Sequence, residues 1–140
     1  MPYGPAWRWA PSGSGRWLVL LYRVLLLFKF VGVVLYGGGL IGALVATSAA
    51  DRKRAVHAIA SPGLVVTWTA GYFLTLQLNV ALTEPWIVGG LSLSLVSQLA
   101  LVAMATRERR TGVGAWLAAV PFLLVLVLMI FRPRWPGVDP

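Results

Sequence analysis

The sequence predicts an all-α membrane protein in which four transmembrane helices form a bundle. Of the 140 residues, 59% are hydrophobic and only 11% are charged, which is too apolar for an ordinary water-soluble domain. The charged residues fall into short clusters, and the apolar runs between them reach the roughly 20 residues that a helix needs to cross a bilayer. We therefore expect a single membrane domain over residues 1–140.

The first apolar run covers residues 24–50 and follows Arg16, Trp17 and Arg23. Because basic and aromatic residues suit the headgroup layer, the first helix is expected to begin near Trp17 and to continue to residue 50. Residues 1–16 are rich in Pro, Gly and Ser, a composition that predicts an irregular N-terminal arm.

Lys29 interrupts this first run. A lysine at the centre of a bilayer costs about 2.5–3.5 kcal/mol on insertion scales. We therefore expect Lys29 to face protein or a bound group rather than lipid. The alternative that the segment is a signal peptide is disfavoured, because Lys29 interrupts the run and a signal peptide has only ~7–15 apolar residues.

Three further apolar runs predict helices at residues 62–82, 86–105 and 113–131. Pro62 follows Ser61, a good cap, so it is expected to open the second helix. Pro121 lies inside the last helix, where it should kink the axis and free a carbonyl group. The prolines of residues 133–140 predict a non-helical tail.

Lysine and arginine accumulate in cytoplasmic loops, and their distribution predicts that both termini are non-cytoplasmic. The first and third predicted loops contain Arg52, Lys53, Arg54, Arg107, Arg109 and Arg110, whereas residues 83–85 contain no basic residue. An even number of helices also places Trp116 at one interface and three tryptophans at the other: Trp17, Trp86 and Trp135. These residues are expected to mark the two interfaces of a bacterial inner-membrane protein.

The net charge of +8 does not require a nucleic acid partner. Basic residues at two membrane surfaces, without a long basic tract, are better explained by anionic lipid headgroups. The expected partners are the lipid bilayer and other membrane subunits or a second copy of the chain.

Small and polar residues within the helices predict which faces pack. Gly38, Gly42 and Ala46 recur every four residues, a pattern that lets another helix or a flat ligand approach the backbone. Two pairs of polar residues each share a helix face and are expected to form interhelical hydrogen bonds: Thr75 with Asn79, and Ser94 with Gln98. A polar path for a proton or a solute is the alternative interpretation of these polar pairs.

Residues for catalysis or metal binding are scarce. The chain has no cysteine, which excludes thiolate chemistry, and its only histidine, His57, lies among basic residues in a predicted loop. The four acidic residues all fall in predicted loops or in the tail, and no phosphate-binding, hydrolase or metal-ligand motif is present. We expect no catalytic residues and no metal site, which favours a non-catalytic protein without excluding an enzyme.

Residues 28–40, with the sequence FKFVGVVLYGGGL, resemble the first-helix signature of the HemJ-type protoporphyrinogen oxidase family. Residues 59–68 are similar to that family's proline-led second helix, Pro85-Trp86 to the start of its third, and residues 120–133 to its last helix and closing basic-proline pair. The resemblance covers most of the chain and implies a four-helix membrane fold, which CopD-like copper-resistance membrane proteins also have.

The resemblance also implies haem ligation and porphyrinogen oxidation, but the matching positions differ. Lys29 stands where the family has its first-helix histidine, and Val88 and Gly90 stand where it has a histidine and a lysine. We therefore expect a non-catalytic subunit that packs within a larger membrane complex and has no cofactor. The alternative is a haem- or porphyrin-handling protein in which Lys29 and Gly38 contact the tetrapyrrole.

Overall fold

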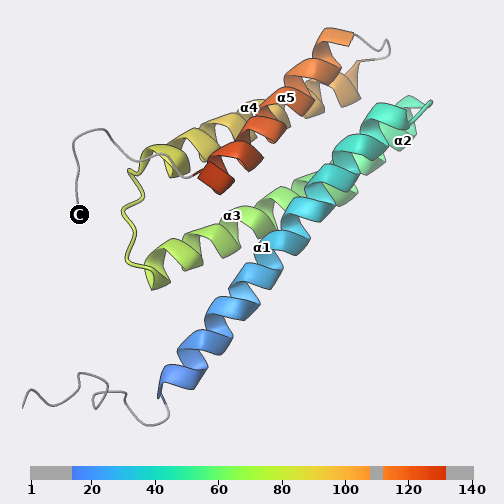
Figure 1. Ribbon diagram of the computed structural model, residues 1–140. Coiled ribbons are helices and arrows are strands. Elements are labelled where there is room, and N and C mark those ends of the chain that lie inside the picture. The colour runs from blue at the N-terminus through green and yellow to red at the C-terminus, as the bar shows by residue number, and fades with distance from the viewer. Residues whose placement is uncertain (1–13, 108–111, 132–140) are drawn as a thin grey trace, which may run out of the picture.

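The structure is a computed structural model that describes residues 14–107 and 112–131 (Figure 1). In this part of the chain all regular elements are helical, and four helices are long and apolar enough to cross a membrane. The predicted all-α four-helix fold is confirmed. The elements are α1 (Ser14–Val45), α2 (Ala49–Arg54), the π-helical segment η2 (Ala55–Ala60), α3 (Ser61–Gln77), α4 (Pro85–Thr106) and α5 (Gly112–Phe131).

The second membrane span starts earlier than predicted, because α2, η2 and α3 form one continuous helix over Ala49–Gln77. Ser48 caps it, since the Ser48 hydroxyl oxygen accepts a hydrogen bond of 3.0 Å from the Asp51 backbone N–H. Pro62 therefore lies inside this helix rather than at its start. The π-helical segment that ends two residues before it provides the local change in hydrogen bonding that lets a proline stay within a transmembrane helix.

The same span ends at Gln77, five residues before the predicted end at Leu82. Asn79 has a φ of 56°, and the Val80 N–H donates to the Thr75 carbonyl at 3.0 Å. This is the helix-ending Schellman motif, in which a residue in the left-handed conformation stops the helix. The predicted interhelical role of Asn79 is therefore wrong, because Asn79 is exposed beyond the end of α3.

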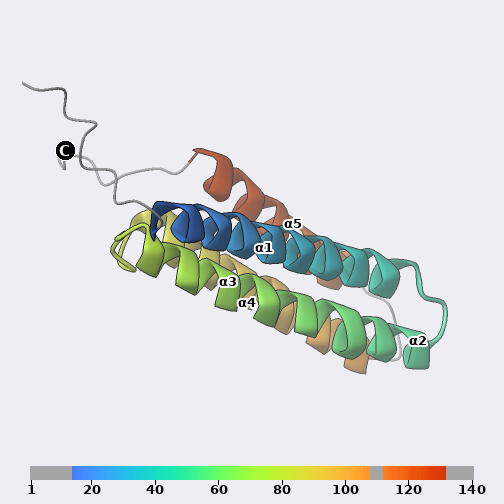
Figure 2. The same ribbon diagram turned by 90° about the horizontal axis from the view of Figure 1, so that it is seen from below.

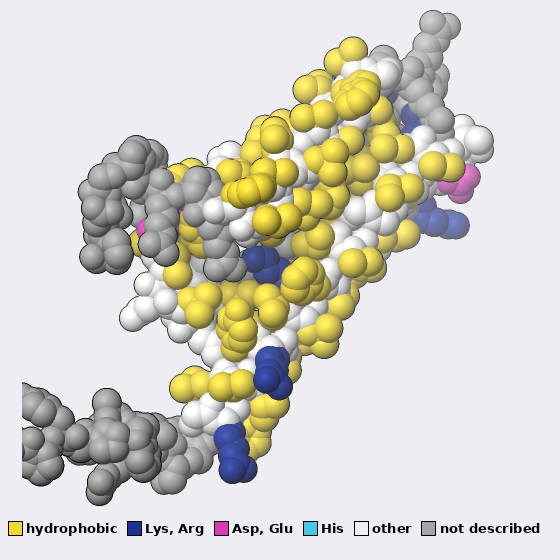
Figure 3. All heavy atoms as spheres, viewed as in Figure 1, with side chains coloured by type: hydrophobic (Ala, Val, Ile, Leu, Met, Phe, Trp, Pro, Cys, Tyr) yellow, Lys and Arg dark blue, Asp and Glu magenta, His cyan; other side chains and the backbone are white. Residues whose placement is uncertain are grey.

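The four spans form two antiparallel pairs, α1 with the helix that ends in α3, and α4 with α5 (Figure 1). Seen from below, α1 lies beside α5 and α3 lies beside α4, so the two pairs face each other (Figure 2). Large apolar side chains are exposed on all four spans, as expected for helices that contact lipid (Figure 3).

Glycines set the distance between α1 and α3. A Cβ atom at Gly63 would lie 2.6 Å from the Tyr36 backbone nitrogen, and one at Gly39 would lie 2.5 Å from the Ala60 nitrogen. A Cβ atom at Gly32 would overlap Thr67. Only glycine fits at such contacts, where the two backbones approach closely.

The predicted small-residue stripe does not form this contact. Gly38 is exposed, and apart from its chain neighbours and the nearby backbone of α1, no described atom lies within 4 Å of the place where its Cβ would be. Gly42 comes closer to a neighbour, since its Cβ would lie 3.4 Å from the Ala55 Cβ. Close packing within the chain is therefore wrong for Gly38, and contact of this stripe with a partner or ligand stays a prediction.

The buried core lies in the half of the bundle that contains η2. It includes Tyr36, Val56 and Leu101, each at most 2% exposed, together with Ala60 and Ala118. The opposite half has few buried side chains between the two pairs, because a cavity separates them there.

Candidate functional site: an intramembrane cavity

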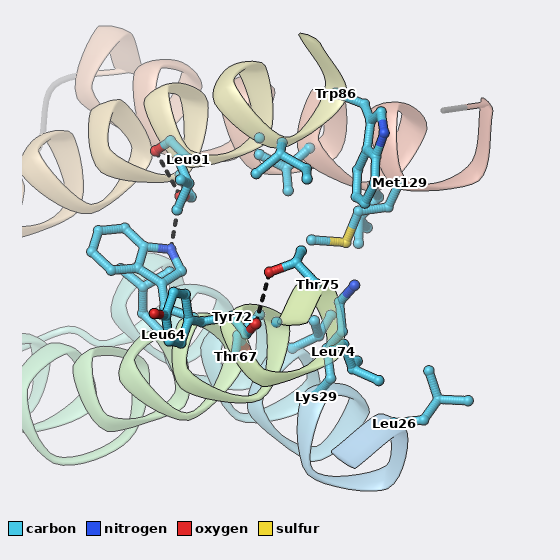
Figure 4. Close-up of a pocket in the computed structure, with 18 of the residues that line it drawn as sticks. Leu26, Lys29, Leu64, Thr67, Tyr72, Leu74, Thr75, Trp86, Leu91 and Met129 are labelled. Carbon is cyan, nitrogen blue, oxygen red and sulfur yellow. Dashed lines mark hydrogen bonds between the residues drawn. The ribbon is translucent and has the colours of Figure 1, made fainter. Parts of the chain in front are cut away.

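A cavity of about 380 Å³ lies between the pair α1–α3 and the pair α4–α5 (Figure 4). All four helices contribute to its lining, which is mostly apolar. In the space-filling view, a hollow between α1 and α5 contains Lys or Arg atoms among apolar side chains (Figure 3). These basic atoms are visible from outside the molecule, so the hollow is open on this face.

Helix α1 lines the cavity with one stripe of residues. Tyr22, Leu26, Lys29, Val33 and Tyr36 follow one another at alternating spacings of four and three, which places them along one face of a helix. The glycines that contact α3 lie on an adjacent face. The cavity face and the packing face of α1 are therefore separate.

Lys29 is half-buried and points from α1 into the cavity (Figure 4). This position agrees with the expectation that Lys29 faces the bundle interior rather than lipid. Lys29 is the only Lys, Arg, Asp or Glu among the described residues that line the cavity. The cavity thus has a positive charge within mostly apolar walls, whereas the predicted contact with a bound group stays a prediction.

Several polar side chains contribute to the other walls. Thr75, on α3, donates a hydrogen bond of 2.7 Å to the Tyr72 carbonyl, and both residues line the cavity (Figure 4). Trp86 and Met129 lie across from them, on α4 and α5 (Figure 4). Trp86 was predicted to mark a membrane interface, but it is half-buried in the cavity wall.

A buried chain of hydrogen bonds closes the inner end of the cavity. The Tyr36 hydroxyl lies 2.7 Å from the Ser97 oxygen, and Ser97 in turn donates to the Ala118 carbonyl at 2.6 Å. Because Ser97 donates onward, Tyr36 donates to Ser97, and α1, α4 and α5 are linked. Ala118 lies in the turn before Pro121, where the proline interrupts the backbone hydrogen bonding of α5. Ser97 therefore donates a hydrogen bond to a backbone carbonyl close to this interruption.

Two further hydrogen bonds join the pairs on the α3–α4 side. The Trp68 indole N–H donates to the Ser94 oxygen at 3.1 Å, and the Gln98 amide donates to the Ser61 hydroxyl at 2.8 Å. Ser94 and Gln98 thus bond to the neighbouring helix, but their partners are Trp68 and Ser61 rather than the expected polar pair Thr75 and Asn79. Thr75 is buried but bonds within its own helix, so its predicted interhelical hydrogen bond is not among those observed.

Arg52 was predicted to mark a membrane interface in an exposed loop, but it is only 3% exposed. Its guanidinium donates to the Arg107 carbonyl at 3.3 Å, just beyond the last turn of α4. A cation is favoured there by the partial negative charge of a helix C-terminus. Arg52 therefore joins the two pairs at the end of the bundle opposite the cavity.

The remaining predicted interface residues are exposed wherever the structure describes them: Trp17, Lys53, Arg54, Arg107 and Trp116. Arg109, Arg110 and Trp135 lie outside the described residues. Their roles at the membrane surface stay predictions, and so does the placement of the termini.

The histidine ligation that the HemJ resemblance implies does not fit this cavity. His57, the only histidine of the chain, is exposed in η2 and does not line the cavity. Within the described ranges, no group of three or more His, Cys, Asp and Glu side chains could hold a metal ion. Sequence reasoning missed Tyr36, which lines the cavity, and its hydrogen-bond partner Ser97, because neither belongs to a recognised motif.

Comparison with known proteins yields no relative of this chain: no family model, no curated protein and no solved structure matches it.

Proposed function

We propose that this chain is a non-catalytic integral membrane protein that binds a membrane-soluble ligand in the cavity between its two helix pairs. The observation that supports the proposal is the cavity itself. Its volume of about 380 Å³ falls in the range of about 300–1,000 Å³ that is usual for small-molecule sites, which are also mostly apolar with a few placed polar groups.

A binding role is better supported than a catalytic one. None of the described residues that line the cavity is His, Cys, Asp or Glu, the side chains that most often transfer protons or act as nucleophiles. Hydroxyl, indole and ammonium groups remain, and these suit recognition and orientation of a ligand.

The experiment fills the cavity with a side chain. Gly90 lines the cavity, and apart from its chain neighbours and the nearby backbone of α4, no described atom lies within 4 Å of the place where its Cβ would be. Gly90→Leu should therefore be accommodated while occupying ligand space. Gly38→Leu is the matched control, because Gly38 has the same open surroundings on the lipid-facing side. Gently purified protein should contain a reproducible ligand, detected by mass spectrometry after extraction. That ligand should be lost from Gly90→Leu and retained by Gly38→Leu. Equal ligand content in all three proteins would refute the proposal.

A separate measurement, the absorption spectrum of the purified protein, tests the tetrapyrrole alternative. A porphyrin held through its carboxylates at Lys29, rather than through iron, is the version that a cavity without histidine can accommodate. A Soret absorption band in the purified parent, absent from Gly90→Leu, would support it, and a colourless parent would exclude it.

A role as a subunit of a larger membrane complex is supported by a different observation. The exposed surface at Gly38 is a place where a second helix could approach the backbone closely. Gly38→Leu should then reduce co-purification of partner subunits, whereas Gly90→Leu should not. Unchanged partners after Gly38→Leu would contradict this second role without affecting the ligand-binding proposal.

A further inference from the structure

The charge within the cavity restricts its ligand. The Lys29 side chain points into the cavity, where its positive charge lies among mostly apolar walls and is complementary to a negatively charged group on a ligand. Tyr22 and Tyr72 also line the cavity, and a tyrosine hydroxyl can donate a hydrogen bond to an anion.

The apolar remainder of the cavity extends from Lys29 toward its closed end. Val33, Phe122 and Val125 line this part, and the Tyr36–Ser97 hydrogen bond lies at its end. A polar headgroup would find no charged partner there, but a hydrocarbon chain would be buried among apolar side chains. The open hollow between α1 and α5 provides lateral access from the bilayer.

We infer that the cavity binds a single-chain amphiphile with an acidic headgroup, which pairs with Lys29 while its hydrocarbon chain occupies the apolar part. This inference rests on the proposed ligand-binding function. A volume of about 380 Å³ lies near the lower end of the usual range of ligand sites. That size favours one hydrocarbon chain over the two chains of a phospholipid.

The test compares ligands that differ only in the headgroup. The full chain, stripped of lipid and held in an uncharged detergent, is titrated with a fluorescent fatty acid, and unlabelled oleate or oleyl alcohol then displaces it. Partition into protein-free micelles is subtracted. Oleate should displace the probe at a concentration at least about tenfold lower than oleyl alcohol, because a charge-assisted hydrogen bond is worth that factor or more. Oleyl phosphate should behave like oleate, since it shares the chain and the acidic headgroup.

Variants then locate the headgroup. Lys29→Met should remove the preference for oleate, and Lys29→Arg should retain it. Arg23→Met is the matched control, since Arg23 is an exposed cation of α1 outside the cavity lining, and it should leave the preference unchanged.

The outcomes separate this inference from the proposed function. Equal displacement by oleate and oleyl alcohol would overturn the acidic headgroup while leaving a ligand-binding cavity intact. Displacement by phosphatidylglycerol or a porphyrin at a tenfold lower concentration than oleate would overturn the single chain. If the probe does not bind saturably, or binds Gly90→Leu as it binds the parent, the amphiphile inference falls, whereas the proposed function is decided by the ligand content of purified Gly90→Leu.

Discussion

At Gly39 the absence of a single side-chain carbon decides how closely two helices pack. A Cβ there would lie 2.5 Å from the Ala60 nitrogen, whereas at the neighbouring Gly38 it would meet no described atom within 4 Å outside the nearby part of α1. Gly39→Ala should lower the free energy of unfolding by about 1–3 kcal/mol through overpacking. Gly38→Ala should leave it unchanged or raise it by up to about 1 kcal/mol, since alanine favours a helix over glycine. Unfolding in detergent measures both, and equal effects would contradict the packing.

The Tyr36–Ser97 hydrogen bond should couple the two side chains energetically. Both side chains are at most 2% exposed, and their oxygens lie 2.7 Å apart. Tyr36→Phe and Ser97→Ala should each cost about 1–3 kcal/mol, because each leaves a buried polar group without its partner.

A double-mutant cycle checks this pair. The double variant should be less destabilised than the sum of the single variants by about 0.5–3 kcal/mol. Ser92→Ala provides the control, since Ser92 is an exposed serine on the same helix. Additive single effects would show that the two hydroxyl groups do not interact.

Among the elements, the end of α3 depends on the backbone conformation of one residue. Asn79 has a φ of 56°, a conformation that costs most residues with a Cβ about 1–2 kcal/mol. Asn79→Ala should therefore destabilise the protein by about 1 kcal/mol, while Asn79→Gly should be neutral. Thermal unfolding of the two variants tests this, and a neutral Asn79→Ala would argue against the left-handed turn.

The continuous helix from Ala49 to Gln77 shows how an element tolerates a proline. Pro62 lies two residues after the end of the π-helical segment, and Gly63, next to it, contacts α1. The irregular turn thus lies where the second span packs against the first. A proline at this place shapes the contact between α1 and α3 rather than starting a helix.

For the whole molecule, the two pairs are joined at one end and apart at the other. The described hydrogen bonds between the pairs involve Tyr36, Arg52, Ser61 and Trp68 on one side. All of them lie toward the core and away from Leu26 and Met129 at the other end of the cavity. This unequal connection is what leaves room for a ligand between the pairs.

The orientation of the molecule in the membrane can be measured directly. The chain contains no cysteine, so single cysteines can be placed at two exposed positions, Arg54 and Thr83. We expect an impermeant thiol reagent to label Thr83→Cys from outside intact cells and to spare Arg54→Cys, because the basic residues beside Arg54 favour the cytoplasm. The opposite labelling would reverse the topology.

The number, type and approximate position of the spans could be predicted from the sequence, because apolar run length and proline positions are local properties. The third span was expected at residues 86–105 and is observed at Pro85–Thr106. The start of the second span was missed although its signal was local: Ser48 with Asp51 three residues later is a capping pattern. The end of α3 at Asn79 is also local, but an asparagine in an apolar run is ambiguous.

The sequence by itself determined that Lys29 lies in a membrane span and needs a polar or buried environment, because run length and charge require it. Only the tertiary structure decided which of the adjacent glycines Gly37, Gly38 and Gly39 contacts another helix. Neighbouring positions on a helix differ by about 100°, and the same composition can pack through any of those faces. The cavity beside Lys29 likewise follows from how two helix pairs meet, and its lining comes from four spans whose relative rotation no local pattern specifies.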